Sequence, residues 1–348
     1  MLSFSAAELS NAAKRYGRQS KEKISVADIT PENPKMEVLY QRFQQFPLRL
    51  AHGANDGDWM AFQLGIKPVI REFISTVHLE RLRQRCKQHN WELVVLPAPM
   101  TENRWTGQFM KAKGKQSTKA SNFFVYIGRD RKRLQAIRDI DSDLLASGYF
   151  RKWFKSSKAH RKTGELLGYP TCCIEAFCSC LEDNRKLLQR SHQRSSTFLP
   201  LLNTLSLNMF HYVCWTPCRF DCEESLRFAK QVDNHLQAIA DPSYSAIQRY
   251  LSMPRLYVDD RRQILFDGTH QADGTVEYST AYVPFQFDRA KHNMAFDWVF
   301  YAHCVSRFLQ GNQFRVVGST IEIFSNGTAI DKVVLKPRPI LFPFASRW

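Results

Sequence analysis

The chain of 348 residues is 44% hydrophobic and 24% charged, which is the balance of a folded protein and excludes a disordered one. A chain of this length buries enough surface to fold without disulfide bridges. Its N-terminus carries no secretion signal, and there is no run of about eighteen apolar residues that would cross a membrane. These features predict a cytoplasmic protein with reduced thiols and no membrane partner.

The net charge of +16 is concentrated in the first half of the chain. Residues 1–168 contain 30 Lys and Arg against 16 Asp and Glu, whereas the remaining residues contain 19 against 17. Basic clusters attract polyanions such as nucleic acids. The run RDRKRLQAIR supplies the predicted substrate-binding residues, Arg129, Arg131, Lys132 and Arg133. The alternative interpretation is a set of solvated helix faces with a flexible basic linker.

The first hundred residues are predicted to be mostly helical. Apolar residues recur at spacings of three and four in 34–51 and in 66–90, and Pro68 fits the first turn of the second helix. The apolar run WELVVL at 91–96 predicts a strand. A polar, basic linker is predicted to follow at 111–121.

The segment SNFFVYIGRDRKRLQAI at 121–137 predicts a strand, a turn and a helix, and with WELVVL it indicates a small α/β unit. Its one glycine, Gly128, is far short of a dinucleotide-binding fingerprint. From about 147 to 251 the pattern is helical again. The last hundred residues favour strands, and Asn326-Gly327 is the preferred two-residue turn of a hairpin.

The predicted fold is therefore α+β, with a helical N-terminal portion, a small α/β unit, a central helical unit that carries the cysteines, and a strand-rich C-terminal portion. The boundaries follow the changes in pattern: a mostly helical basic region (1–110), the linker (111–121), a domain with a strand and then the cysteine motifs (122–255), and a strand-rich region packed on the central unit (256–348).

Seven of the nine cysteines fall in two short stretches, GYPTCCIEAFCSC at 168–180 and HYVCWTPCRFDC at 211–222. In the first stretch, a helix is expected to end at Gly168, and Pro170 is suited to open the next one. The first turn of that new helix then contains two adjacent cysteines, Cys172 and Cys173.

The second stretch also leads into a helix. Asp221 is a natural N-cap and Glu224 completes a capping box, which makes Cys222 the first helical residue and leaves Cys218 in the loop before it. Helix N-termini favour negative charge and lower the pKa of a thiol, and the thiolate is the form that binds metals. Both stretches therefore predict sulfur ligands.

We predict that the two stretches share one metal, with ligands drawn from Cys172, Cys173, Cys214, Cys218, Cys222 and His211. One of the adjacent pair is expected to join Cys218 and Cys222, and the fourth position is open to the other of the pair, to Cys214 or to His211. The preferred cofactor is a [4Fe–4S] cluster, with zinc as the alternative. The spacing matches neither the C-x2-C pairs of zinc fingers nor the C-x3-C-x2-C run of radical-SAM enzymes. Cys178 and Cys180 are assigned to packing.

The two stretches resemble an uncharacterised prokaryotic protein family that shares a G-Y-P-x-C-C-x-x-x-F motif and a later H-x-P-C-x-x-x-C-x-x-S-L motif. The matching positions are Gly168, Tyr169, Pro170, Cys172, Cys173 and Phe177, then Pro217, Cys218, Cys222, Ser225 and Leu226. His211 lies farther from Pro217 than that pattern requires. The resemblance covers about residues 120 to 230 and carries no established activity.

Together these features predict a cysteine-ligated, iron–sulfur metalloprotein that performs or supports an enzymatic reaction on a phosphate-bearing or nucleic-acid substrate. One alternative is a nucleic-acid-binding module with a structural zinc. Another is a thiol or redox enzyme that uses the cysteines at the helix N-termini.

Overall fold

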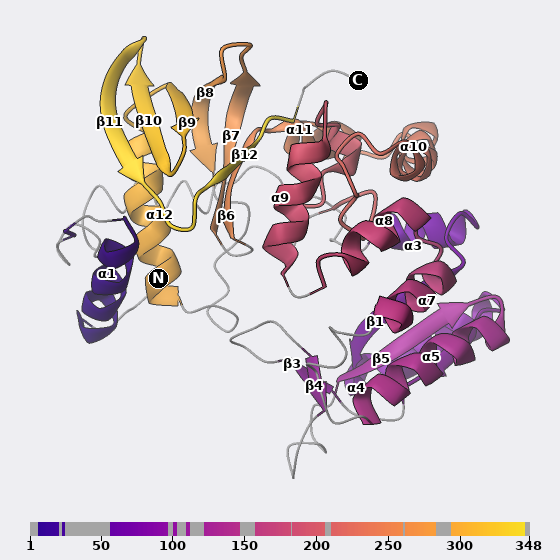
Figure 1. Ribbon diagram of the computed structural model, residues 1–348. Helices are drawn as coiled ribbons and strands as arrows, with labels where there is room; N and C mark the ends of the chain where they lie inside the picture. The colour runs from indigo at the N-terminus through magenta and orange to yellow at the C-terminus, as the bar shows by residue number, and fades with distance from the viewer. Residues whose placement is uncertain are drawn as a thin grey trace. The chain divides into compact units, whose positions relative to one another are not determined.

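The computed structural model describes residues 6–20, 23–24, 56–96, 100–102, 109–111, 122–146, 157–181, 183–205, 210–259, 262–282 and 294–344. The chain forms two compact units (Figure 1). We call Asn55–Arg194 with Tyr212–Ala238 the cysteine unit, and Met1–Ala54 with Ser195–His211 and Ile239–Trp348 the C-terminal unit. The fold is mixed α+β with a strand-rich C-terminal sheet, which confirms the predicted class.

The C-terminal unit is built on a seven-stranded antiparallel sheet in the order β11-β10-β9-β8-β7-β6-β12. Its strands are β6 (Arg255–Asp259), β7 (Arg262–His270), β8 (Thr275–Tyr282), β9 (Gln313–Val317), β10 (Thr320–Ser325), β11 (Thr328–Val334) and β12 (Ile340–Phe342). The predicted hairpin is confirmed, because Ser325 pairs with Thr328 across Asn326 and Gly327, both of which have positive φ. Residues 310–335 thus need only local turns to form three strands.

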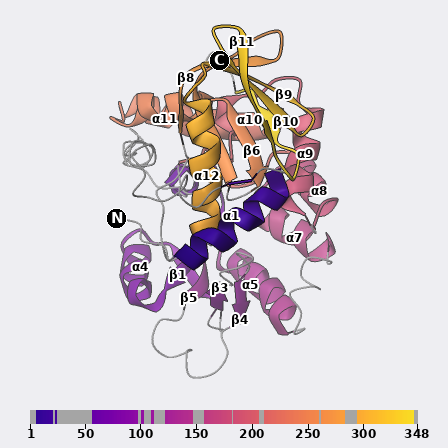
Figure 2. The ribbon, with the colours of Figure 1, turned by 90° about the vertical axis from the view of Figure 1, so that its left-hand side faces the viewer.

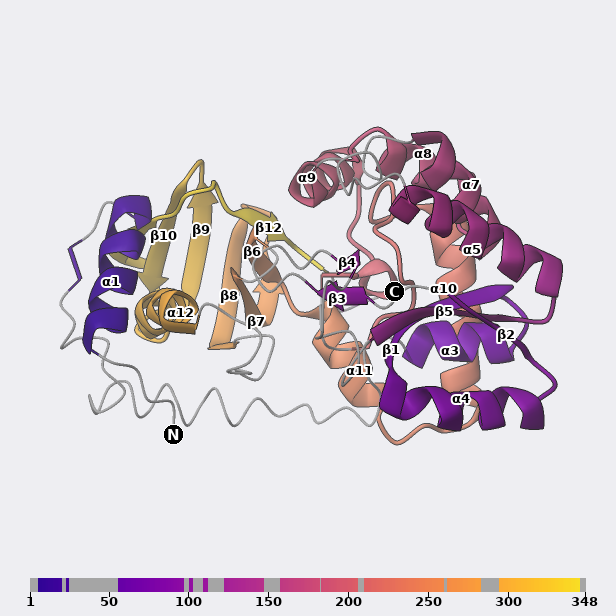
Figure 3. The same ribbon diagram turned by 90° about the horizontal axis from the view of Figure 1, so that it is seen from below.

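Two helices, α1 (Ala6–Ser20) and α12 (Met294–Phe308), pack together against this sheet (Figures 2 and 3). The core between these helices and the sheet is dominated by aromatic and aliphatic side chains. Phe266 of β7 is central to it, with ring centroids 4.3 Å from Phe314 and 5.0 Å from Phe308. The unit also contains the short helices η3 (Pro200–Leu202) and α11 (Tyr244–Ser252).

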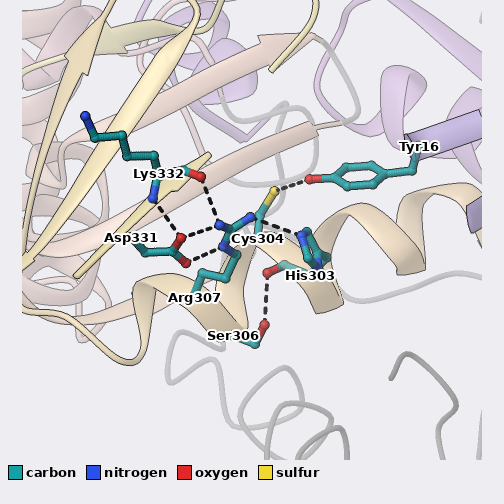
Figure 4. A network of polar contacts seen from close by, with 7 residues as sticks. All are labelled: Tyr16, His303, Cys304, Ser306, Arg307, Asp331 and Lys332. Atoms are coloured by element: carbon teal, nitrogen blue, oxygen red, sulfur yellow. Dashed lines mark hydrogen bonds and ion pairs between the residues drawn. The ribbon is translucent and has the colours of Figure 1, made fainter. Parts of the chain in front are cut away.

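Polar contacts fix α12 between α1 and β11 (Figure 4). The hydroxyl of Tyr16 lies 3.0 Å from the sulfur of Cys304, which is fully buried. Arg307 forms a two-pronged ion pair with the carboxylate of Asp331, and its guanidinium also donates to the carbonyl of Lys332 over 2.9 Å. These contacts fix the position of α12 along its axis, which apolar packing alone does not specify.

The cysteine unit contains a smaller sheet in which β5 (Asn122–Gly128) pairs antiparallel with β1 (Val69–Ser75), β2 (Glu92–Val95) and β3 (Met100–Glu102); β3 also pairs with β4 (Phe109–Lys111). Helices cover both faces (Figure 3), with α3 (Asp56–Gln63) and α4 (Thr76–Gln88) on one, and α5 (Arg131–Ala146) and α7 (Ser157–Leu167) on the other.

The strands alternate between these two helical layers. In β5, Tyr126 points into the core beneath α5 and α7, whereas Val125 and Ile127 point into the core beneath α3 and α4. Val69 and Ile70 of β1 divide in the same way. Both faces are apolar because both are covered, and the predicted small α/β unit is confirmed.

One predicted helix is wrong in its first part. Residues 69–75 form strand β1, and the helix predicted over 66–90 begins only at Thr76. A strand that is buried on both faces lacks a polar alternation, so its apolar residues also fit helical spacing. The helix predicted at 34–51 and residues 112–121 of the predicted linker lie outside the described residues.

Helices α8 (Thr171–Cys178), α9 (Asn184–Arg194) and α10 (Glu223–Ala238) complete the cysteine unit. Among the described residues, no helix is long and apolar enough to cross a membrane.

Candidate metal centre

The first cysteine pair lies at the start of α8. Helix α7 ends at Leu167 because Gly168 adopts φ +81°, a conformation that side chains disfavour, and a Cβ on it would lie 2.6 Å from Pro68 Cδ. Pro170, with φ −59°, is the N-cap of α8. The next helical turn contains Cys172, which is exposed, and Cys173, which is buried. The sequence therefore predicted this helix start to within one residue.

The second pair lies at the start of α10, with one correction to the predicted cap. The helix begins at Glu223, and the carbonyl of Cys222 accepts its first helical hydrogen bond from Leu226 N–H over 2.8 Å. Cys222 is therefore the N-cap, in place of Asp221, whose carboxylate pairs with Arg219 at 3.2 Å. The sulfur of Cys222 takes the capping role by accepting the backbone N–H of Ser225.

The two helix starts bring four sulfurs together. The Sγ atoms of Cys172, Cys173, Cys218 and Cys222 all lie within 4.8 Å of one another. Cys222 Sγ is 3.6 Å from that of Cys172 and 3.8 Å from that of Cys173, and the adjacent pair is separated by 3.9 Å. These four cysteines are close enough to bind a metal.

Hydrogen bonds from the surrounding chain orient these sulfurs. The backbone N–H of Cys218 donates to Cys173 Sγ over 3.3 Å, and the hydroxyl of Ser225 lies 3.2 Å from the same sulfur. Trp215 Nε1 in turn donates to the Ser225 hydroxyl over 3.0 Å. Outer contacts of this kind fix ligand geometry around a metal.

The thiols of the four-sulfur group differ in how readily they lose a proton. Hydrogen bonds from the thiols of Cys173 and Cys218, together with the N–H of Ser225, lower the pKa of the Cys222 thiol. The pKa of Cys173 is raised, because its thiol hydrogen-bonds to Cys218 and Cys222 and is buried. Cys222 is therefore the sulfur best prepared to bind as a thiolate, and a metal would displace the remaining protons.

Two other predicted ligands are not among the four. Cys214 Sγ lies 3.0 Å from Lys67 Nζ and 3.3 Å from the Tyr169 hydroxyl. Burial and the carboxylate of Asp58 raise the pKa of Cys214 to about 12, which keeps it a neutral thiol. His211, the other open choice for the fourth position, also lies outside the group of four sulfurs.

The remaining cysteines differ in burial, and Cys178 and Cys180 are only half-buried. Cys86 and Cys304 are buried in hydrophobic cores. Cys178 Sγ contacts the carbonyl of Ser157 at 3.5 Å, and neither Cys178 nor Cys180 belongs to the four-sulfur group.

The predicted substrate-binding residues lie at the start of α5, which Asp130 caps through the N–H groups of Lys132 and Arg133. Arg131 is exposed and pairs with Glu92 at 3.0 Å. Arg129 donates to the carbonyl of Phe62 over 3.1 Å and packs on its ring. The guanidinium of Arg129 thus has a structural role, whereas Lys132 extends from the surface.

One buried ion pair was not predicted from the sequence. Lys67, which is 1% exposed, pairs with the carboxylate of Asp58 at the start of α3 and also contacts Cys214. Lys67 and Cys214 are 147 positions apart in the sequence, so no local sequence pattern predicts their contact.

No family model, curated protein or solved structure matches the chain. Its fold and site define an α+β protein with a four-cysteine group able to hold a metal ion.

Proposed function

We propose that the protein is a metalloprotein in which Cys172, Cys173, Cys218 and Cys222 bind one metal ion as thiolates. The observation that carries this proposal is the spacing of the sulfurs, 3.6 to 3.9 Å for three of the pairs. A tetrahedral ion with metal–sulfur bonds of about 2.3 Å separates its ligands by about 3.8 Å. The spacing therefore supports a single tetrahedral ion.

Zinc fits this arrangement better than an iron–sulfur cluster. Four cysteine ligands leave no open position, as in structural zinc sites. In a [4Fe–4S] cluster each thiolate binds a different iron, which places the sulfurs farther apart than around one ion. A thiol enzyme is disfavoured because Cys222, whose pKa is lowered, is only 3% exposed.

The metal would join the starts of α8 and α10, which are about fifty residues apart in sequence. Such a link ties metal binding to folding, because the four ligands do not converge in the unfolded chain. We infer that the metal holds this part of the cysteine unit together.

A polyanionic partner is the second part of the proposal. The cysteine unit contains 29 Lys and Arg against 18 Asp and Glu, and Arg131 and Lys132 are exposed at the start of α5. Clustered cations bind phosphates in a salt-dependent manner. The metal-stabilised unit would thus bind, or support a reaction on, a phosphate-bearing or nucleic-acid substrate.

Metal analysis of protein purified anaerobically under reducing conditions tests the first part. We expect one zinc per chain, no acid-labile sulfide and no visible absorption, and we expect Cys222→Ser to lose the metal while Cys180→Ser retains it. Four irons per chain together with acid-labile sulfide would show that the cysteines hold a cluster and not a single ion. A protein that lacks both metals, or a Cys222→Ser variant that keeps full occupancy, would contradict the site.

Binding of a random-sequence single-stranded RNA tests the second part. We expect affinity to fall steeply with salt, and the double variant Arg131→Gln/Lys132→Gln to weaken binding and flatten the salt dependence. The double variant Lys158→Gln/Lys162→Gln, on exposed positions of α7, is the matched control. Equal effects of the two variants would argue against a defined surface at α5.

A further inference from the structure

A cavity of about 260 Å³ lies within the cysteine unit, next to the four-sulfur group. Its wall is formed by α7, α8, Tyr169 between these two helices, the start of α9, the segment 214–216 and one residue of β1, Arg71. Cys173, a member of the four-sulfur group, is part of the wall. The cavity therefore lies directly beside the proposed metal.

The cavity lining combines apolar and polar side chains. The apolar lining comes from Leu167, Ile174, Phe177, Leu187 and Trp215. The ring of Tyr169 lies 4.8 Å from that of Trp215. The polar lining comes from Arg71, His160, Thr163, Tyr169, Asn184, Cys214 and Thr216. A mostly apolar pocket with a few grouped polar atoms is typical of a small-molecule site.

Arg71 is a charged residue of the cavity lining, and its contact with the carboxylate of Asp141 is long. Arg71 Nη1 lies 3.5 Å from Asp141 Oδ2, while the same oxygen accepts a hydrogen bond of 2.6 Å from the Tyr126 hydroxyl. The guanidinium has five N–H donors, so this long contact occupies one of them at most. Its side chain is 27% exposed, which leaves it accessible from the cavity.

Tyr169 adds a neutral donor beside Arg71. Its oxygen accepts a hydrogen bond from the Cys214 thiol over 3.3 Å, which leaves the phenolic O–H able to donate. Burial raises the pKa of Tyr169 well above its usual value, so the hydroxyl keeps its proton. The nearby ammonium of Lys67 is balanced by Asp58, so it adds little net charge.

We propose that this cavity binds a small organic anion, with its carboxylate or phosphate held by Arg71 and Tyr169 and a compact aromatic or aliphatic body packed against Trp215 and Phe177. A planar guanidinium can donate two parallel hydrogen bonds to either anionic group. The site is separate from the α5 surface and does not depend on which metal the cysteines hold. Its position against Cys173 would place the ligand at the edge of the metal centre.

Three probes of similar size test the charge requirement on the wild-type protein, with metal content measured in the same samples. Benzoate and phenyl phosphate carry the anionic group, and benzamide is the neutral counterpart of benzoate. In titrations followed by NMR we expect at least one anion to bind about tenfold or more tightly than benzamide, the order expected for a charge-assisted hydrogen bond. The preferred anion distinguishes a carboxylate site from a phosphate site. If inorganic phosphate binds more weakly than phenyl phosphate, the phenyl ring contributes to binding through the apolar lining of the cavity.

Substitution of the arginine locates the binding. Arg71→Gln should weaken the anions about tenfold and leave benzamide unchanged, whereas Arg83→Gln, at an exposed position of α4, should change neither. The proposal is overturned if benzamide binds as tightly as the anions, or if no probe binds saturably. It is also overturned if a folded Arg71→Gln variant keeps wild-type affinity; if that variant fails to fold, the comparison of probes on the wild type still decides.

Discussion

The two units differ in the chemistry that dominates their interiors, although the C-terminal unit also buries charged side chains, Arg255 and Asp297 among them. In the C-terminal unit the space between the sheet and α12 is filled by rings such as Phe266, Phe308 and Phe314. The cysteine unit has apolar layers on both faces of its sheet, but the region around α8 and α10 contains four sulfurs, and Lys67 and Asp58 are buried beside Cys214.

The difference predicts that the units fail under different perturbations. Apolar cores are stabilised in proportion to the area that they bury, whatever else is present. Buried thiolates and charges are tolerated only while each has its partner, because an unpaired charge in a core is costly. Removing one partner should therefore destabilise the cysteine unit, and reducing side-chain volume should destabilise the C-terminal unit.

Metal removal should have the largest effect. Structural zinc sites have apparent binding free energies of about 10 kcal/mol or more near neutral pH, so its loss should release the starts of α8 and α10. Hydrogen exchange on the full chain, before and after chelation, should show faster exchange in 171–178 and 218–230 and no change in β7 to β9. The Cys180→Ser variant should resemble wild type. Equal loss of protection in both units would contradict the expected difference in how the two units respond to metal removal.

The Phe266→Ala variant perturbs the other unit. Truncation of a fully buried ring to Ala costs about 3–5 kcal/mol, and this ring contacts three aromatic neighbours. Denaturant unfolding should show this loss in the C-terminal unit while metal content stays at the wild-type level. Val317→Ala, at a position that is 52% exposed, is the control and should change little. Loss of metal from Phe266→Ala would mean that the two interiors are not independent.

The Lys67→Met variant tests the buried pair without touching a sulfur ligand. It leaves the Asp58 carboxylate without its cation, which should cost about 3 kcal/mol in the free energy of unfolding. The double variant Lys67→Met/Asp58→Leu should recover much of this loss, because no unpaired charge remains. Additive losses in the two single variants and the double variant would show that the charges do not act as a pair.

Local chemistry explains why all four sulfurs were among the ligands predicted from the sequence. Gly168 and Pro170 end one helix and open the next within three residues, and the cysteines follow at once. The Asn326-Gly327 turn is local in the same sense. What the sequence left open was the fourth ligand, with the second cysteine of the adjacent pair, Cys214 and His211 as candidates, because that position depends on which side chains the fold brings within reach of the other three.

The sequence predictions were wrong where contacts between distant residues outweigh the local structural preference of a segment. Residues 69–75 fit helical spacing, but pairing with β5 along seven residues makes them a strand. Asp221 is the better cap by residue type, yet its ion pair with Arg219 leaves Cys222 to cap α10. The contacts of Lys67 with Cys214 and of Arg71 with Asp141 join residues of β1 and its preceding loop to residues seventy or more positions away, which no pattern in the sequence reveals.

The smallest effect is expected at the ion pair of Arg307 and Asp331, which has side-chain exposures of 16% and 25%. Although partial burial opposes its ionisation, the hydrogen bond from Arg307 lowers the pKa of Asp331 below the ordinary value of 3.8. The pair therefore contributes fully above that value, and its contribution is lost as pH falls through the lowered pKa.

Arg307→Met should cost about 1 kcal/mol at neutral pH, since water still screens this pair, unlike that of Lys67 and Asp58. Thermal unfolding at pH 7 and at pH 3 should show the difference from wild type shrinking in acid. Arg307→Lys keeps the charge but not the two-pronged geometry. Its stability at neutral pH should fall between those of wild type and Arg307→Met. A cost as large as that of Lys67→Met would mean that partial exposure does not weaken this ion pair relative to the buried pair of Lys67 and Asp58.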